Sequence, residues 1–198
     1  MSIALALTLS RIFLGPIFVI VYLYHQQLGI SLQWLPTMLI SLAGISELSD
    51  FFDGAVARKM NKVTELGKIL DPMADSVFRL SVLLAFTQGI VQIPLLLVCV
   101  FFYRDTIIST LRTVCALRGF TLAARMSGKI KAVIQATIGF FIMILMIPYS
   151  TGHLDLASLQ TISFYSVLVG AIYTTCSGIE YLIANRSYIM RALDLFRN

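Results

Sequence analysis

Residues 50–75 read DFFDGAVARKMNKVTELGKILDPMAD and place four aspartates between two apolar stretches of the chain. An ionised carboxylate inside a membrane helix costs about 2.5–3.5 kcal/mol on insertion scales, so each one needs a partner. The aspartates form two pairs, Asp50 with Asp53 and Asp71 with Asp75. Residues three or four positions apart project from one face of a helix, so each pair shares a face. A loop at residues 58–67 would join the two helices into a hairpin and bring both pairs together.

The composition indicates that this hairpin belongs to a membrane protein. Of the 198 residues, 58% are hydrophobic and only 13% are charged, whereas an ordinary soluble domain has about 25% charged residues. A membrane-spanning helix needs about 20 apolar residues, and no alternation typical of a membrane barrel is present. Suitable stretches occur at residues 7–24, 34–52, 73–90, 93–117, 130–149 and 159–183. We therefore expect an all-α integral membrane protein with six transmembrane helices, forming a single domain over residues 1–198.

The distribution of basic residues predicts the orientation in the membrane. Lys and Arg gather between the second and third expected helices, between the fourth and fifth, and after the sixth, while residues 25–33, 87–92 and 150–158 contain none. Cytoplasmic loops carry an excess of Lys and Arg. We expect a multi-pass protein of the cytoplasmic (inner) membrane, without a cleaved signal peptide, with both termini and the functional site facing the cytoplasm. The net charge of +5 then reflects topology and contact with anionic membrane lipids, not a nucleic-acid partner.

The four aspartates are candidate ligands of divalent cations. Four neighbouring carboxylates repel one another unless cations neutralise them. Mg²⁺ and Mn²⁺ prefer oxygen ligands, and four carboxylates suit two ions about 3.5–4 Å apart. Alternatively, the aspartates cap helices or pair with Arg58 and Lys68. Their number and spacing, with Gly54 and Gly67 between them, favour two Mg²⁺ or Mn²⁺ ions.

The same stretch resembles the signature of the CDP-alcohol phosphotransferases, DxxDGxxAR(x8)GxxxDxxxD, at every fixed position. The matching residues are Asp50, Asp53, Gly54, Ala57, Arg58, Gly67, Asp71 and Asp75. Residues 7–11 (LTLSR) and 128–135 (GKIKAVIQ) are similar to segments of the bacterial phosphatidylglycerophosphate synthases within that family. The resemblance therefore extends over nearly the whole chain.

The family resemblance implies a reaction and roles for these residues. An alcohol would attack the β-phosphorus of CDP-diacylglycerol, giving a phospholipid and CMP. The four aspartates would hold the two ions, and Asp75 would also be the catalytic base. The resemblance further implies a homodimer and a CDP-binding site. The residues of that site would be Thr8, Asp53, Gly54, Ala57, Arg58 and Gly67.

A group of basic residues in the second half of the chain predicts the acceptor alcohol. Arg104 and Asp105 fall near the middle of the expected helix at residues 93–117, where they must face a polar cavity or each other. Further basic residues nearby would form a cationic pocket for an alcohol that carries a phosphate, although membrane topology alone also explains most of them. The candidates are Arg104, Arg112, Arg118, Lys129 and Lys131. Glycerol-3-phosphate fits such a pocket.

We therefore expect synthesis of phosphatidylglycerophosphate from CDP-diacylglycerol and glycerol-3-phosphate. Inositol phosphate, serine and phosphatidylglycerol are alternative acceptors, of which serine suits a cationic pocket least. A cation transporter is a remote alternative, because membrane carboxylates also mark ion paths. Transporters usually hold their acidic residues near the middle of the bilayer, whereas these four are expected at one face.

Overall fold

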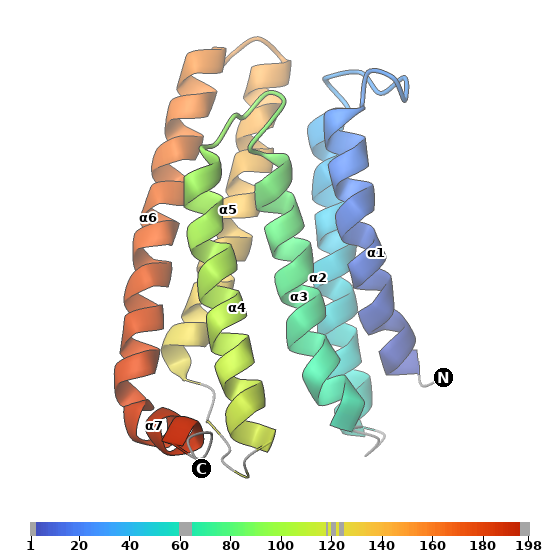
Figure 1. Ribbon diagram of the computed structural model, residues 1–198. Helices are drawn as coiled ribbons and strands as arrows, with labels where there is room; N and C mark the ends of the chain where they lie inside the picture. The colour runs from blue at the N-terminus through green and yellow to red at the C-terminus, as the bar shows by residue number, and fades with distance from the viewer. Residues whose placement is uncertain (1–2, 60–64, 118, 120–121, 123–124, 195–198) are drawn as a thin grey trace. The chain divides into compact units, whose positions relative to one another are not determined.

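Helices are the only regular secondary structure in the part of the chain that the computed structural model describes, as the sequence predicts. This part comprises residues 3–59, 65–117, 119, 122 and 125–194, with the side chains of residues 11–49, 73–117, 119, 122 and 125–190. The helices are α1 (Ile3–Leu23), α2 (Leu35–Lys59), α3 (Glu65–Ala85), α4 (Leu95–Leu117), α5 (Met126–Ser150), α6 (Leu156–Ala184) and α7 (Arg186–Asp194), and Figure 1 shows them in chain order.

The helix bounds differ from the expected apolar stretches chiefly at α2, which continues to Lys59 and does not end at residue 52, at α3 and at α7. Helix α3 begins at Glu65 and not at residue 73, so Asp71 and Asp75 lie within the helix and not at its start. Apolar residues mark the part of a helix that suits lipid, and the polar first turns of α3 continue the same helix without that signal. Helix α7 has only nine residues, far fewer than a spanning helix needs, so a search for spans misses it.

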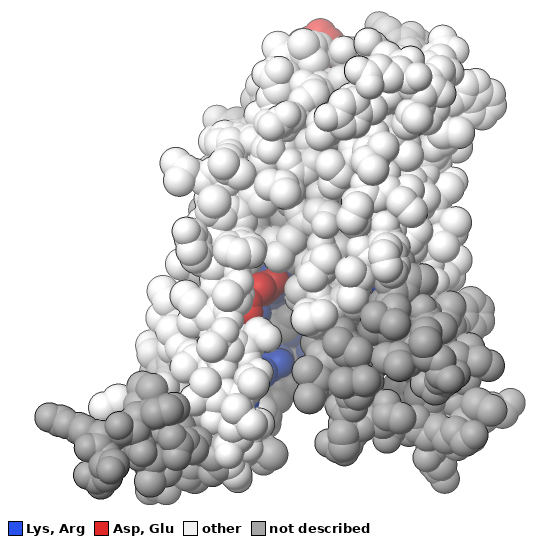
Figure 2. Space-filling view, turned by 45° about the vertical axis from the view of Figure 1, so that its right-hand side comes forward, with Lys and Arg blue, Asp and Glu red and all other residues white. Residues whose placement is uncertain are grey.

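Two helices in the described part of the chain are long and apolar enough to cross a membrane, namely α5 and α6. Shorter apolar helical segments occur at Arg11–Leu23 and Leu35–Ser49, within α1 and α2. Figure 2 shows a face on which the described surface is mostly uncharged, with acidic and basic side chains confined to small areas. An uncharged surface of this kind suits contact with lipid hydrocarbon.

The chain divides into two compact units. The first comprises Met1–Ile93 and Gly139–Phe164, and the second comprises Pro94–Ile138 and Tyr165–Asn198. In the first unit α1 packs against both α2 and α3 (Figure 1). Its aromatic core joins α1 to α3 and to the residue that follows α3: the ring of Phe18 lies edge-on to Phe78 and Phe86, with centroids 6.2 and 6.0 Å apart.

Close contact between α1 and α3 depends on a small residue at position 15. A Cβ atom added to Gly15 would lie 2.8 Å from the hydroxyl oxygen of Ser81, which is closer than side chains can approach. Without water between helices, association in a membrane relies on such close packing. Gly15 therefore permits the approach that places α1 beside the aspartates of α3.

The hydroxyl of Tyr22 organises the connection that follows α3. It donates a hydrogen bond to the carbonyl of Gln88 at 3.1 Å and accepts bonds from the amides of Ile90 and Val91 at 3.1 and 3.0 Å. Tyr22 is buried, and its ring packs edge-on against Phe86. Backbone groups outside a helix need hydrogen-bond partners where water is scarce. The Tyr22 hydroxyl alone is the partner of three such groups.

In the connection between α5 and α6, Asp155 caps the first turn of α6. Its carboxylate accepts a hydrogen bond from the Ser158 amide at 2.9 Å. Hydrogen bonds from Ser158 hold the pKa of Asp155 below its usual value, because they favour the charged form. The sharp start of α6 thus has a local cause in the sequence.

Replacing Tyr22 with Phe should lower the stability of the first unit. The change leaves the ring in place but removes the partner of two backbone amides, and each unsatisfied buried group costs about 1–3 kcal/mol. We expect a lower midpoint of thermal unfolding in detergent. Tyr24→Phe is the matched control, since Tyr24 is exposed. Equal midpoints for Tyr22→Phe and the control would contradict the structural role of the Tyr22 hydroxyl.

Candidate functional site

The four signature aspartates lie on two helices that both pack against α1. Asp50 and Asp53 belong to α2, and Asp71 and Asp75 belong to α3, so helical spacing places each pair on one face. The side chain of Asp75 is described, and those of the other three aspartates lie outside the described residues. The same holds for the side chains of the other predicted CDP-binding residues, which are Thr8, Gly54, Ala57, Arg58 and Gly67.

The Asp75 carboxylate lies beside arginines from two helices. Nη1 of Arg11, on α1, is hydrogen-bonded to Oδ1 of Asp75, and Nη2 of Arg79, one turn further along α3, lies 3.8 Å from Oδ2. The other terminal nitrogen of the Arg79 guanidinium, Nη1, lies 4.0 Å from Oε1 of Glu47 on α2. Opposite charges on both sides compensate the charge of Asp75 and fix the direction of its oxygens.

Arg11 is a site residue that the sequence analysis did not single out. Its side chain is only 1% exposed, and a buried arginine is rare unless it is paired. A signal was present, because Arg11 is a basic residue inside the first expected membrane span, and such a residue is as costly there as an aspartate. The cost of a charge in a membrane helix therefore indicates a partner for Arg11 as it does for Arg104.

The chemistry of the predicted ligands fits Mg²⁺ or Mn²⁺. Asp75 retains 21% exposure of its side chain and offers carboxylate oxygen, the donor that these ions prefer. Within the described side chains, no group of three or more His, Cys, Asp or Glu residues lies together. Asp50, Asp53 and Asp71 are outside that set, so the described part of the site comprises Asp75 and the arginines that contact it.

A second group of charged residues lies in the other unit, on α4 and α5. Asp105 Oδ1 lies 3.1 Å from Nη1 of Arg104, and Asp105 Oδ2 lies 2.5 Å from Nζ of Lys131. Nη2 of Arg104 also donates a hydrogen bond to Ser177 of α6 at 3.2 Å. We expected Arg104 and Asp105 to face a polar cavity or each other. They contact each other, and each has one further partner, Ser177 on α6 for Arg104 and Lys131 on α5 for Asp105.

The other three predicted acceptor-site residues are Arg112, Lys129 and Arg118. Arg112 donates a hydrogen bond from Nε to the Tyr181 hydroxyl at 3.1 Å, and its guanidinium lies 5.2 Å from the centre of that ring. Lys129 is exposed on α5, and Arg118 lies outside the described residues. The structure therefore brings Arg104 and Lys131 together around Asp105, and pairs Arg112 with an aromatic residue of α6.

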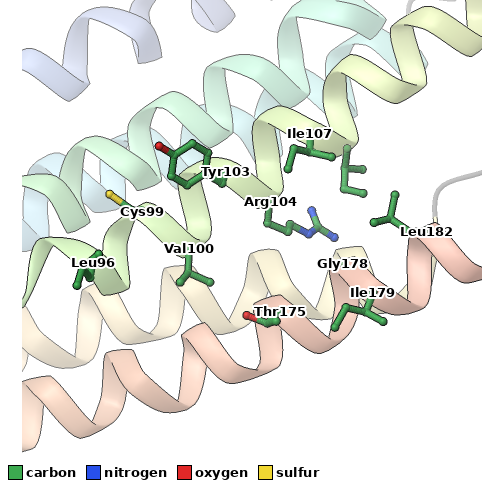
Figure 3. Close-up of a pocket in the computed structure, with 11 residues that line it drawn as sticks. Leu96, Cys99, Val100, Tyr103, Arg104, Ile107, Thr175, Gly178, Ile179 and Leu182 are labelled. Atoms are coloured by element: carbon green, nitrogen blue, oxygen red, sulfur yellow. The ribbon is translucent and has the colours of Figure 1, made fainter.

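Arg104 also borders a groove between α4 and α6, shown in Figure 3. The groove has a volume of about 410 Å³, and Arg104 is the charged side chain among its described lining residues. Its apolar walls include Leu96, Val100, Tyr103, Ile107, Ile179 and Leu182. These walls surround the stem of Arg104 with hydrocarbon, which strengthens the electrostatic interactions of its guanidinium.

Comparison with known proteins identifies the family of this chain. The family model for CDP-alcohol phosphatidyltransferases matches residues 1–176. The chain is 33% identical over 187 residues to the CDP-diacylglycerol–glycerol-3-phosphate 3-phosphatidyltransferase of Bacillus subtilis, covering 90% of this chain and 92% of that protein. It is 29% identical over 184 residues to the Rickettsia typhi protein of the same name, covering 92% and 96% of the two chains. The chain therefore belongs to the CDP-alcohol phosphatidyltransferase family.

Proposed function

We propose that this protein transfers the phosphatidyl group of CDP-diacylglycerol to glycerol-3-phosphate, giving phosphatidylglycerophosphate and CMP. The observation that carries the proposal is the match along at least 90% of both chains to relatives named for this reaction. The signature aspartates on α2 and α3 and the cationic group around Asp105 support it independently. The aspartates would hold metal ions that neutralise the charge of a diphosphate, and the cationic group would bind a phosphate.

The proposed setting is the cytoplasmic (inner) membrane, with six transmembrane helices, α1 to α6, and both termini and the active site in the cytoplasm. The lengths of α5 and α6 and the placement of Lys and Arg support this topology. Helix α7, at nine residues, is too short to span and would lie at the cytoplasmic surface. We further propose that residues 1–198 act as one domain and that the enzyme is a homodimer.

The proposed chemistry starts at Asp75. The hydroxyl oxygen of the acceptor forms a bond to the β-phosphorus of CDP-diacylglycerol, the bond from that phosphorus to the CMP oxygen breaks, and the hydroxyl proton passes to Asp75. Arg11 and Arg79 orient the Asp75 carboxylate for this role. Two Mg²⁺ or Mn²⁺ ions, held by Asp50, Asp53, Asp71 and Asp75, would supply charge neutralisation for the diphosphate and the leaving CMP.

The remaining signature residues bind the nucleotide in this proposal. The Arg58 guanidinium pairs with diphosphate oxygens, and Gly54, Ala57 and Gly67 leave room for the CDP group. Thr8, on α1, contacts the nucleotide. Asp53 contributes to both the metal ions and the CDP group.

The acceptor phosphate would bind at the cationic group of the other unit. Arg104 and Lys131 converge on one carboxylate, and charge-assisted hydrogen bonds from such donors are the strong kind that phosphate accepts. Arg112, Arg118 and Lys129 would add positive charge around this pocket. A phosphate-bearing alcohol benefits from this charge, whereas serine does not.

The direct test is an assay of the purified protein in detergent micelles with CDP-diacylglycerol and Mg²⁺ or Mn²⁺. Glycerol-3-phosphate, inositol phosphate, serine and phosphatidylglycerol are supplied in turn, and CMP and the lipid product are measured. We expect CMP release with glycerol-3-phosphate and none when the ions are removed with a chelator. Release with another acceptor alone would overturn the proposed substrate, and no release with any acceptor would overturn the proposed activity.

Asp75→Asn should abolish turnover without unfolding the protein. Asparagine keeps an oxygen that accepts a hydrogen bond from Arg11 but cannot take up a proton, and losing a general base costs about 10²–10⁴-fold in rate. The measurement is CMP release at saturating substrates, with thermal unfolding as the check on folding. Asp155→Asn is the matched control, because Asn caps a helix as well as Asp. A wild-type rate in Asp75→Asn would exclude the base role.

Arg104→Ala should raise KM for glycerol-3-phosphate more than KM for CDP-diacylglycerol. A hydrogen bond to a charged group contributes about 1.5–3 kcal/mol, which corresponds to roughly 10- to 150-fold in affinity. The control is Arg125→Ala, since Arg125 forms an exposed ion pair with Glu180 at 3.0 Å and exposed pairs contribute little. Equal changes in KM for both substrates would argue against an acceptor pocket at Arg104.

A further inference from the structure

Asp105 connects two cations that come from two different helices. Each of its oxygens contacts a different partner, Nη1 of Arg104 at 3.1 Å and Nζ of Lys131 at 2.5 Å. The exposed fractions of the Asp105 and Lys131 side chains are only 9% and 3%. Both contacts are therefore shielded from water, and buried charge pairs of this kind are much less mobile than surface pairs.

The contact between Arg104 and Asp105 does not follow from their positions in the helix. Adjacent helical residues point in directions about 100° apart and do not face each other, so the Arg104 side chain must turn to reach its neighbour. Two glycines leave room for that turn. A Cβ atom on Gly178 of α6 would lie 3.1 Å from Cγ of Arg104, and one on Gly128 of α5 would lie 3.6 Å from its Nη2.

Ser177 fixes the other side of the guanidinium. Its hydroxyl accepts a hydrogen bond from Nη2 of Arg104 at 3.2 Å, and it lies next to Gly178, which faces the Arg104 stem (Figure 3). Nη1 and Nη2 thus have partners, while the buried Nε of Arg104 has none. The guanidinium is held by Asp105 and Ser177 through one N–H of each terminal nitrogen.

The shape of a carboxylate explains why this arrangement suits a phosphate. Both oxygens of a carboxylate are bonded to one carbon atom. The donors that contact these two oxygens therefore lie close enough together to reach a single oxyanion. A phosphate likewise carries several oxygens on one atom. With two cations and one anion, the group also keeps a net charge of +1 toward a phosphate.

From these contacts we infer that Asp105 is a positioning residue of the enzyme: it holds Arg104 and Lys131 at the separation at which they bind the phosphate of the acceptor alcohol. This inference rests on the proposed function, in which Arg104 and Lys131 form the acceptor pocket. Asp105 itself does not touch the acceptor, because its charge would repel the phosphate. It acts through the two cations, which without it would repel each other and separate.

The test compares Asp105→Asn with Asp105→Glu in the full-length protein in detergent micelles. In Asp105→Asn, KM for glycerol-3-phosphate should rise about tenfold or more, corresponding to the loss of a well-placed charged contact. Both kcat and KM for CDP-diacylglycerol should stay within about twofold of wild type, the spread expected of a residue that acts only on acceptor binding. Asp105→Glu keeps the charge and should recover most of the affinity.

The control is Glu180→Gln, which removes a carboxylate of the same unit from an exposed ion pair. If Asp105→Asn behaves like Glu180→Gln while Arg104→Ala raises KM for glycerol-3-phosphate, the positioning role of Asp105 is wrong and the acceptor pocket stands. If Arg104→Ala has no effect either, the acceptor pocket is wrong. Equal losses for both substrates in folded Asp105→Asn would show a general structural role and would also overturn the inference.

A second variant covers the case in which Asp105→Asn does not fold. Ser177→Ala removes the other partner of the Arg104 guanidinium without burying a lone charge. It should raise KM for glycerol-3-phosphate severalfold with kcat unchanged. A wild-type KM in Ser177→Ala would show that Arg104 needs no positioning partner and would overturn the inference.

Discussion

A charged side chain among apolar helices is costly unless a polar or oppositely charged partner lies beside it, and this constraint shapes the charged groups of both units. In one unit Asp75 of α3 lies between Arg79 on its own helix and Arg11 from α1. In the other, Asp105 of α4 lies between Arg104 on its own helix and Lys131 from α5. Each aspartate thus contacts one cation from its own helix and one from another helix, and so joins two helices.

The two aspartates differ in accessibility, and this difference separates their proposed roles. Asp75 retains 21% exposure, whereas Asp105 retains 9% and pairs with a lysine that is almost fully buried. A base must reach the proton that it takes up, so only the more accessible carboxylate suits that role. The more deeply buried carboxylate suits a fixed support for other side chains, because buried ion pairs move little.

The sequence alone is sufficient to predict the helical class and the position of the aspartate pairs on two helices. Both follow from local properties, namely apolar stretches of spanning length and residue spacing. The sequence also predicts that the side chains of Arg104 and Asp105 are not exposed to water, since both residues interrupt an apolar stretch. It does not predict their partners Lys131 and Ser177, which lie 26 and 73 residues from the group that each contacts. Partners between helices depend on packing that no single segment encodes.

The distinction between local properties and packing also explains why the sequence predicts neither the partner of Arg11 nor the first residue of α3. That Arg11 requires a partner is evident from its apolar surroundings, but its contact with Asp75, 64 residues away, depends on how closely α1 approaches α3. Gly15 permits that approach, and its role becomes visible only beside Ser81. The early start of α3 has another cause, because its first turns are polar and lack the apolar signal that defines a span.

Small residues and charged groups act together in the second unit. A Cβ atom on Gly170 of α6 would lie 2.4 Å from Ile138 and 3.2 Å from Phe101, so α6 packs tightly against α4 and α5 at this point. Within a membrane such packing takes the place of the hydrophobic effect as the force between helices. Close packing limits how far these helices can move apart, so the carboxylate of Asp105 offsets the repulsion between Arg104 and Lys131 where they stand. The rigidity that makes this group costly to disrupt is also what a phosphate-binding pocket requires, because donors fixed in advance bind without the entropic cost of ordering them.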